Sequence, residues 1–103
     1  MYSMKVTINA VHFTADKKLK DLINEKLEKL IKFYDKLVSV EVYLKLENSG
    51  QVKDKIVELK ANIPGKTIIS SASEKSFEAS LDEAQGIMIR QLKRTKEKLK
   101  QAS

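Results

Sequence analysis

The sequence contains no cysteine and only one histidine among its 103 residues. Without cysteine, neither a disulfide framework nor a thiolate metal site can form, so stability must come from packing alone. The single imidazole, that of His12, excludes every site that needs several histidines. We expect His12 to be an ordinary strand residue near the end of a sheet, and we expect no metal site.

Glycine is scarce and long apolar runs are missing. Gly50, Gly65 and Gly86 are isolated, so the chain has no glycine-rich loop of the kind that cradles phosphate. No apolar run approaches the length needed to cross a bilayer, and the first ten residues (MYSMKVTINA) alternate apolar with polar instead of forming a signal-peptide core. We therefore expect a cytoplasmic protein with no membrane segment.

Groupings of side chains that would support catalysis are also lacking. Ser70 and Ser71 are adjacent in an expected strand, where their side chains face opposite ways and have no base nearby. Because no nucleophile, carboxylate pair or ligand cluster can be assembled, we expect no enzymatic activity, no cofactor and no small-molecule substrate.

The composition and charge of the chain indicate one small domain with a basic end. Hydrophobic residues make up 42% of the chain and charged residues 33%, which suits a single globular domain over residues 1–103. The net charge is +6, yet residues 1–89 hold 14 Lys and Arg against 13 Asp and Glu. Nearly all the excess therefore lies in residues 90–103. We expect the last few residues, KQAS, to fray.

The spacing of apolar residues predicts the secondary structure. Apolar residues alternate with polar ones in strands and recur at threes and fours in helices. The predicted elements are a strand at residues 4–13, a helix at 17–35, strands at 37–47, 54–63 and 66–73, and a helix at 77–100. The parity of apolar positions changes after Val11, which indicates either a bulge or a strand end near Ala10.

Caps and turns mark the boundaries of these elements. Asp16 or Thr14 can cap the first helix, and Asp16 is preferred because it places Leu19 in the first turn; Ser76 can cap the second helix. The segment NSGQ is typical of a hairpin turn, and Pro64-Gly65 fits a tight turn with positive φ at the glycine.

The second strand, at residues 37–47, is the clearest in the chain. Its alternation assigns one face to Val38, Val40, Val42, Leu44 and Leu46 and the other to Ser39, Glu41, Tyr43, Lys45 and Glu47. The element order is β-α-β-β-β-α, which predicts an α+β domain: a four-stranded sheet with both helices packed on one face.

The stretch RQLKRTKEKLKQ, residues 90–101, carries six cations and one anion. The helix dipole stabilises cations only in the last turn, by about 0.3–1 kcal/mol each, so it accounts for one or two of the six. Solvated helix faces usually mix both signs of charge. The pattern favours binding of a polyanion, with Arg90 and Lys93 opposite the apolar stripe, Arg94 and Lys100 beside them, and Lys96 and Lys98 flanking the stripe.

Two long stretches support a sharper comparison. LKDLINEKLEKLIKFYDKLVSVEVYLKLE and GKTIISSASEKSFEASLDEAQGIMIRQLKRTKEKLKQ resemble the short ribosome hibernation-promoting factor and ribosome-associated translation inhibitor family, also called the sigma-54 modulation protein family. The resemblance implies a fold like that of a double-stranded-RNA-binding domain. It also implies binding to the small ribosomal subunit and its rRNA, across the mRNA and tRNA paths of the decoding region, which silences ribosomes in stress or stationary phase.

The resemblance also implies which residues contact rRNA phosphates. On the first helix they are Lys20, Lys26 and Lys29, and on the second they are Arg90, Arg94, Lys96, Lys98 and Lys100. Lys93 adds a cation where relatives can be uncharged, and we expect it to contact phosphate as well. Ser76 and Glu78 depart from the family pattern, which often has aspartate and tyrosine at or near these positions. Longer members continue into a domain that pairs ribosomes, so pairing by this chain would need another factor, and we expect a monomer when it is free.

Two alternatives remain open from sequence. The chain could be a general RNA-binding module without preference for ribosomes, or a protein-interaction module whose basic helix docks on an acidic partner. The sequence also does not decide whether the outer sheet face, with Tyr43, Lys45 and Lys60, takes part.

Overall fold

The computed structural model describes residues 4–49 and 52–102, with side chains for residues 4–47 and 54–98. The elements are β1 (Lys5–Ala10), α1 (Lys17–Glu28), the short 3-10 helix η1 (Lys29–Lys32), β2 (Ser39–Ser49), β3 (Val52–Ile63), β4 (Lys66–Glu74) and α2 (Phe77–Ala102). The predicted β-α-β-β-β-α order is confirmed. The backbone of α2 is helical as far as Ala102, and Ser103 lies outside the described residues, so the expected fraying of the end stays a prediction.

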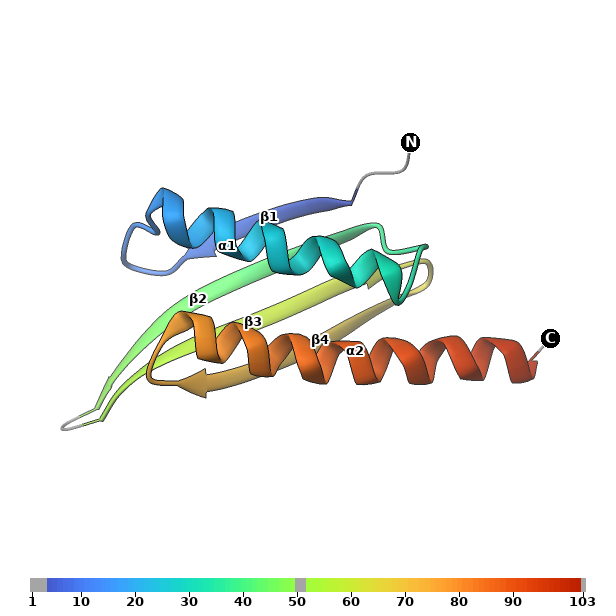
Figure 1. Ribbon diagram of the computed structural model, residues 1–103. Helices are drawn as coiled ribbons and strands as arrows, with labels where there is room; N and C mark the ends of the chain where they lie inside the picture. Colours follow the sequence, from blue (N-terminus) through green and yellow to red (C-terminus); the bar gives the residue numbers. More distant parts are fainter. Residues whose placement is uncertain (1–3, 50–51, 103) are drawn as a thin grey trace.

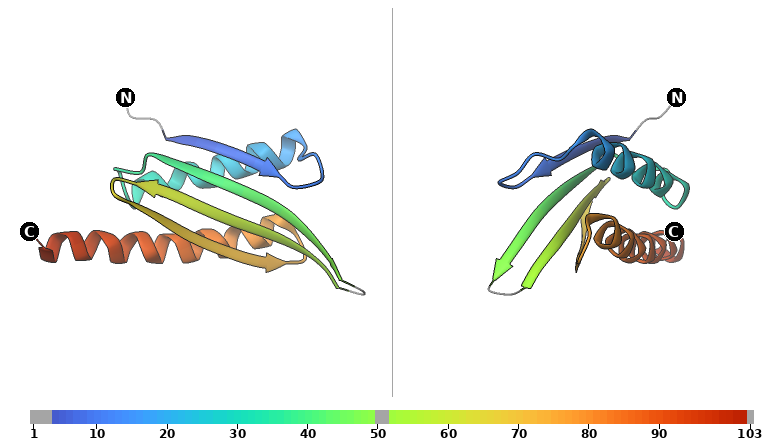
Figure 2. Two further views of the ribbon diagram at one scale, coloured as in Figure 1. Left: turned by 180° about the vertical axis from the view of Figure 1, so that it is seen from behind. Right: turned by 60° about the vertical axis from the view of Figure 1, so that its left-hand side comes forward.

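The sheet has the strand order β1-β2-β3-β4 and is mixed. β1 pairs with β2 in parallel, whereas β2–β3 and β3–β4 are antiparallel hairpins. A parallel pair needs a crossover connection, and α1 supplies it. Both helices lie on the same face of the sheet, and the opposite face carries neither (Figures 1 and 2). The predicted two-layer α+β architecture is confirmed.

The core lies between the sheet and the helices. Val40, Val42 and Leu44 of β2 face the helices, and their register partners Ala61, Leu59 and Val57 of β3 do the same. All are fully buried, as are Ile23 and Leu27 of α1, Leu30 of η1, and Leu81, Met88 and Leu92 of α2. Burying such a side chain contributes about 1.5–3 kcal/mol, so this layer holds both helices on the sheet.

The prediction for the first strand was too long. β1 ends at Ala10, so the change in parity marks a strand end and not a bulge. His12 has a φ of 65°, which is rare for a residue with a side chain, and it lies in the connection to α1 and not in a strand. The chain must leave the sheet there because it has to cross over the sheet face as α1.

The first helix was also predicted too long. The Asp16 cap is confirmed, since the Leu19 amide donates to Asp16 Oδ1 at 2.8 Å. The α-helix stops at Glu28 and tightens into η1, where the Lys29 amide donates to the carbonyls of Leu27 and Lys26. Tight 3-10 turns are common at helix ends, and this one leads the chain back toward the core.

The alternation of the second strand fails at both ends. Val38, predicted to face the core, is 52% exposed although its amide donates to the Asn62 carbonyl of β3, and the preceding Leu37 is buried instead. Leu46 is 48% exposed, at a point where the β2–β3 hairpin extends past the helices (Figure 1). Alternation therefore predicts burial only where a helix covers the strand.

The predicted Pro64-Gly65 turn and the second cap agree with the structure. Gly65 has a φ of 78°, as a tight turn after Pro64 requires. The Ala79 amide donates to Ser76 Oγ at 3.1 Å, which confirms Ser76 as the cap of α2. The β2–β3 hairpin is confirmed by its register, but the prediction of its turn was wrong at Asn48 and Ser49, which are paired with β3 as part of β2. Gly50 and Gln51 of the predicted turn lie outside the described residues.

Candidate nucleic-acid interface

Helix α2 extends well past the end of the sheet (Figures 1 and 2). It spans Phe77–Ala102, which at a rise of 1.5 Å per residue is about 39 Å, and the molecule is 51 Å in its longest dimension. The predicted basic residues lie in the C-terminal half of α2, where Arg94 and Lys98 still face β4 across a hollow and the last turns extend past the sheet. The fold therefore presents them on a helix that is only partly supported by the sheet.

The basic end of α2, defined as residues 90–100, offers cations in several directions. The side chains of Arg90, Lys93, Arg94, Lys96 and Lys98 are all exposed. The ion pairs found among the described side chains, Lys26–Asp82, Lys45–Glu58 and Lys75–Asp54, include none of these five. The Lys100 side chain lies outside the described residues. The charge of the basic end is thus not neutralised within the described part of the chain.

The Lys93 side chain points toward the end of the first helical segment, which consists of α1 and η1. Its Nζ lies 5.2 Å from the ring centroid of Phe33, directly after η1. Such a cation–π contact stabilises by about 0.5–1 kcal/mol at an exposed site and leaves the ammonium open to a further anion. Arg94 and Lys98 instead line a hollow beside β4, so Lys93 and Arg94, which were predicted to lie together on the outer side of α2, face different neighbours.

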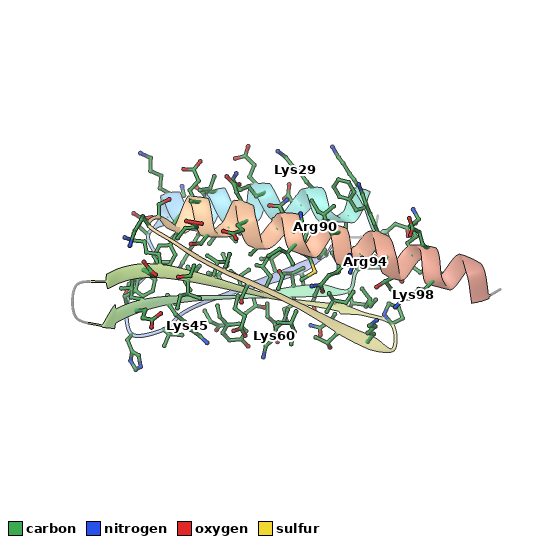
Figure 3. The ribbon with its side chains drawn as sticks, turned by 90° about the horizontal axis from the view of Figure 1, so that it is seen from below. Lys29, Lys45, Lys60, Arg90, Arg94 and Lys98 are labelled. Carbon is green, nitrogen blue, oxygen red and sulfur yellow. The ribbon has the colours of Figure 1, made fainter. Side chains whose placement is uncertain are left out.

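The three predicted residues of the first helical segment are not equivalent. Lys29, at the start of η1, is exposed and lies with Arg90 on the helical side of the molecule (Figure 3). Lys26 forms an ion pair with Asp82 of α2. Lys20 lines a small hollow with Phe13 and Ala15, near the start of α1. Only Lys29 joins the basic end of α2 without an intramolecular partner in the described structure, and the phosphate contacts of all three stay a prediction.

Polar contacts fix the position of α2 on its neighbours. Gln85 Nε2 donates to the Lys26 carbonyl at 2.8 Å, and Ser70 Oγ of β4 donates to the Ala84 carbonyl at 2.9 Å. Ser80 Oγ donates to the Lys55 carbonyl of β3. Because Gln85, Ser70 and Ser80 are buried, removing one partner would leave a buried polar group without a hydrogen bond, which is destabilising. These bonds fix the N-terminal half of α2 against β3, β4 and α1.

Replacing Gln85 by alanine should lower the free energy of unfolding by about 1 kcal/mol, because the Lys26 carbonyl loses its partner from α2. Urea denaturation followed by circular dichroism measures the change. Gln91→Ala is the control, since Gln91 lies in the same helix but is only half-buried. Equal effects of the two substitutions would contradict the assigned role of Gln85.

The outer face of the sheet carries lysines that have partners. Lys45 Nζ lies 3.6 Å from Glu58 Oε2, and Lys60 Nζ lies 5.1 Å from the ring centroid of Tyr43 (Figure 3). Glu41 is the register partner of Lys60. Positive charge on this face is thus offset locally, unlike that of the basic end of α2.

Acidic residues gather where β4 leads into α2, at the opposite end of that helix. The hydrogen bond from Lys75 to Asp54 (2.9 Å) is the main cause that lowers the pKa of the Asp54 carboxyl. A hydrogen bond with Glu83 and repulsion from its charge raise the pKa of Glu74. The molecule is therefore acidic at one end of α2 and basic at the other, a distribution that orients it in the field of a polyanion.

No other kind of site emerges from the part of the chain that the structure describes. There, no three His, Asp or Glu side chains come together as a metal site would need. No helix in the described ranges is both long and apolar enough to cross a membrane.

Fold and charge together define a class: small α+β domains with an uncompensated basic helix on an otherwise nearly neutral body. The chain belongs to the family described as sigma 54 modulation protein / S30EA ribosomal protein, whose model matches residues 6–100. The resemblance noted from sequence is thereby confirmed.

Relatives and solved structures agree with this assignment. Proteins named ribosome hibernation promoting factor are 33% identical in Pseudomonas putida, over 92% of this chain and 89% of the relative, and 29% identical in Klebsiella oxytoca, over 95% and 99%. A ribosomal subunit interface protein from Coxiella burnetii shares the fold with a TM-score of 0.81 at 19% identity, covering 90% of this chain and 98% of that one. The N-terminal domain of Protein Y from Thermus thermophilus also shares the fold, with a TM-score of 0.74 at 21% identity. That match covers 91% of this chain and 99% of the Protein Y domain. The likeness to double-stranded-RNA-binding domains is not tested by these matches and stays a prediction.

The sequence-based site omitted one cation that the fold brings to the basic end. Lys66, the first residue of β4, lies across a hollow from Arg94 and Lys98. No helical periodicity could reveal it, because its closeness to α2 depends on how β4 packs under that helix.

Proposed function

We propose that this protein binds the small ribosomal subunit through its rRNA, occupies the decoding region, and inhibits translation while ribosomes are held inactive in stress or stationary phase. The observation that carries the proposal is the cluster of exposed cations on the basic end of α2, which form no ion pair among the side chains that the structure describes, in a chain of this family. It would act in the cytoplasm, as a monomer when free, and as a binding protein without chemistry of its own.

The physical mechanism is electrostatic and steric. Lys29 and the basic end of α2 would contact phosphates of folded rRNA, which position the protein without reading base sequence. Specificity would come from the shape of the rRNA surface, since folded RNA is recognised largely by shape and by its phosphates and 2′-hydroxyls. Inhibition would follow because mRNA and tRNA need the same space.

The acidic end of α2 would contribute to orientation. Carboxylates such as Glu78 and Glu83 would repel rRNA, so the molecule would approach with the basic end first. The outer sheet face, whose lysines already have partners, would lie away from the strongest phosphate contacts.

A cell-free translation assay with varied order of addition tests the proposal. Protein added to small subunits before mRNA and initiator tRNA should inhibit strongly, whereas the same amount added to assembled initiation complexes should inhibit little, because the site is then occupied. Excess unrelated duplex RNA should not relieve the inhibition. Inhibition that is independent of the order, or relieved by any RNA, would contradict occupation of the decoding region and favour a general RNA-binding module.

A further inference from the structure

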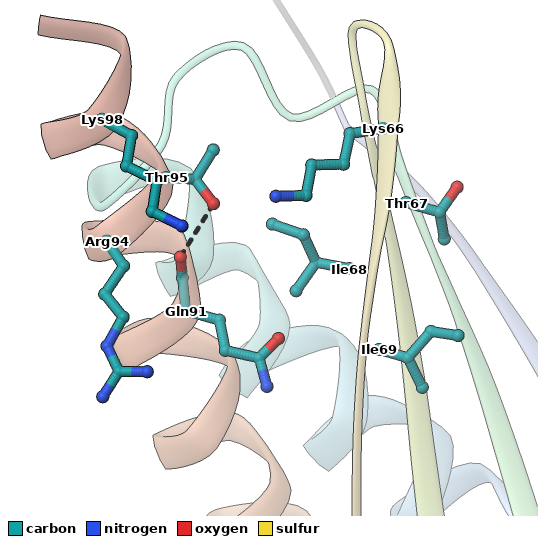
Figure 4. Close-up of a pocket in the computed structure, with 8 residues that line it drawn as sticks. All are labelled: Lys66, Thr67, Ile68, Ile69, Gln91, Arg94, Thr95 and Lys98. Atoms are coloured by element: carbon teal, nitrogen blue, oxygen red, sulfur yellow. Dashed lines mark hydrogen bonds between the residues drawn. The ribbon is translucent and has the colours of Figure 1, made fainter. Parts of the chain in front are cut away.

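A hollow of about 240 Å³ lies between the edge strand β4 and α2 (Figure 4). Lys66, Thr67, Ile68 and Ile69 line it from β4, and Gln91, Arg94, Thr95 and Lys98 line it from α2. Small-molecule sites usually measure about 300–1,000 Å³, so this space suits a group of phosphate size better than a whole cofactor.

The lining of the hollow is cationic. Lys66, Arg94 and Lys98 are exposed, and no acidic side chain is among the lining residues. In Figure 4 the Lys66 chain reaches from β4 toward α2, and the Lys98 chain bends back toward Thr95. Three like charges around one space repel one another, and an anion seated among them removes that repulsion.

Two neutral residues of α2, Gln91 and Thr95, also line the hollow. The Gln91 side-chain amide can donate to a phosphate oxygen. The Thr95 hydroxyl already donates to the Gln91 carbonyl at 3.0 Å, which orders this wall of the hollow.

We propose that this hollow seats one phosphodiester group of RNA, held between Lys66 of β4 and Arg94 and Lys98 of α2. The inference rests on the proposed function and extends it, because it adds the edge strand to an interface otherwise made of helices. The bound RNA strand then runs along the β4 side of the molecule. Free phosphate shares the same chemistry and is the second source that the experiment distinguishes.

The first experiment compares Lys66→Gln with Lys5→Gln. Lys5 and Lys66 are both exposed first residues of edge strands, on opposite sides of the sheet, and each substitution lowers the net charge equally. Binding to isolated small subunits is measured over a series of salt concentrations. Lys66→Gln should reduce the slope of log K against log salt by about one, whereas Lys5→Gln should leave it unchanged.

Lys66→Arg provides a check on chemistry, since guanidinium also binds phosphate and should restore the slope. Thermal melting of each variant should match the wild type, because Lys66 is exposed. Wild-type binding combined with equal slopes for Lys66→Gln and Lys5→Gln would overturn the inference and leave the proposed function standing.

The second experiment titrates the free protein with inorganic phosphate and follows backbone amide shifts by NMR. Saturating shifts at Ile68 and Thr95 in the wild type, lost in Lys66→Gln, would show that the hollow also takes free phosphate. If the wild type fails to bind small subunits, the proposed function fails, and the titration alone then tests whether the hollow binds phosphate. Saturating shifts would then support a phosphate site, and their absence would overturn it.

Discussion

Reversing the charge of Arg90, Lys93 and Arg94 together to glutamate should abolish binding to small ribosomal subunits at physiological salt. Each charge-assisted contact is worth about 1.5–3 kcal/mol, and about 1.4 kcal/mol is a factor of ten, so losing three should weaken binding at least about a thousandfold. Co-sedimentation with isolated subunits measures the loss. The far-ultraviolet circular dichroism should be unchanged, because all three side chains are exposed.

The matched control reverses Lys5, Lys17 and Lys18. These residues are exposed, lie on β1 or in the first turn of α1, and give the same final net charge when reversed. The control should retain most of the binding at physiological salt. If both triple variants lose binding equally, total charge and not the basic end of α2 determines affinity, and the site assignment is wrong.

The largest effect on stability is expected at Leu59, in the middle of the sheet under α2. Its side chain is fully buried on β3, opposite Val42 of β2. Replacement by alanine should lower the free energy of unfolding by about 3 kcal/mol, from lost burial and the cavity left behind. Since small domains have only about 5–15 kcal/mol in total, the urea midpoint should fall markedly.

Leu46→Ala is the control for Leu59→Ala. Leu46 is also a leucine of the sheet, but it is 48% exposed near the tip of the β2–β3 hairpin. Leu46→Ala should lower the free energy of unfolding by less than about 1 kcal/mol. Similar losses in the two variants would contradict the placement of the core between the central strands and the helices.

The parts of the fold that follow from local rules could be predicted from the sequence. Alternation identified β2 and β3, and the side chains of Asp16 and Ser76 marked where the two helices begin. These features depend on residues within one turn or one strand of each other, so the sequence contains their causes.

The errors arise where distant segments decide the outcome. The end of β1 depends on the crossover to α1, and the exposure of Leu46 depends on how far the helices cover the sheet. The predicted length of the first helix missed η1, whose position depends on how the chain returns to the core. Periodicity along one segment carries no information on these contacts.

The candidate site shows the same division. The cations of the basic end were evident from composition, but the Lys26–Asp82 pair joins residues of different helices, and Lys66 joins the site from a strand. The six-cation run therefore indicated that the end of α2 is basic. Its partners, and the different neighbours that Lys93 and Arg94 face, required the tertiary structure.

The most direct test of the central claim is the salt dependence of binding between the wild-type protein and isolated small subunits, measured by sedimentation from about 50 to 200 mM salt. Each phosphate contact contributes about −0.7 to −0.9 to the slope of log K against log salt. With Lys29, Lys66 and the five described cations of the basic end available, the account predicts tight binding at low salt and a slope of about −3 or steeper. Binding that does not change with salt, or no binding at 50 mM, would contradict it.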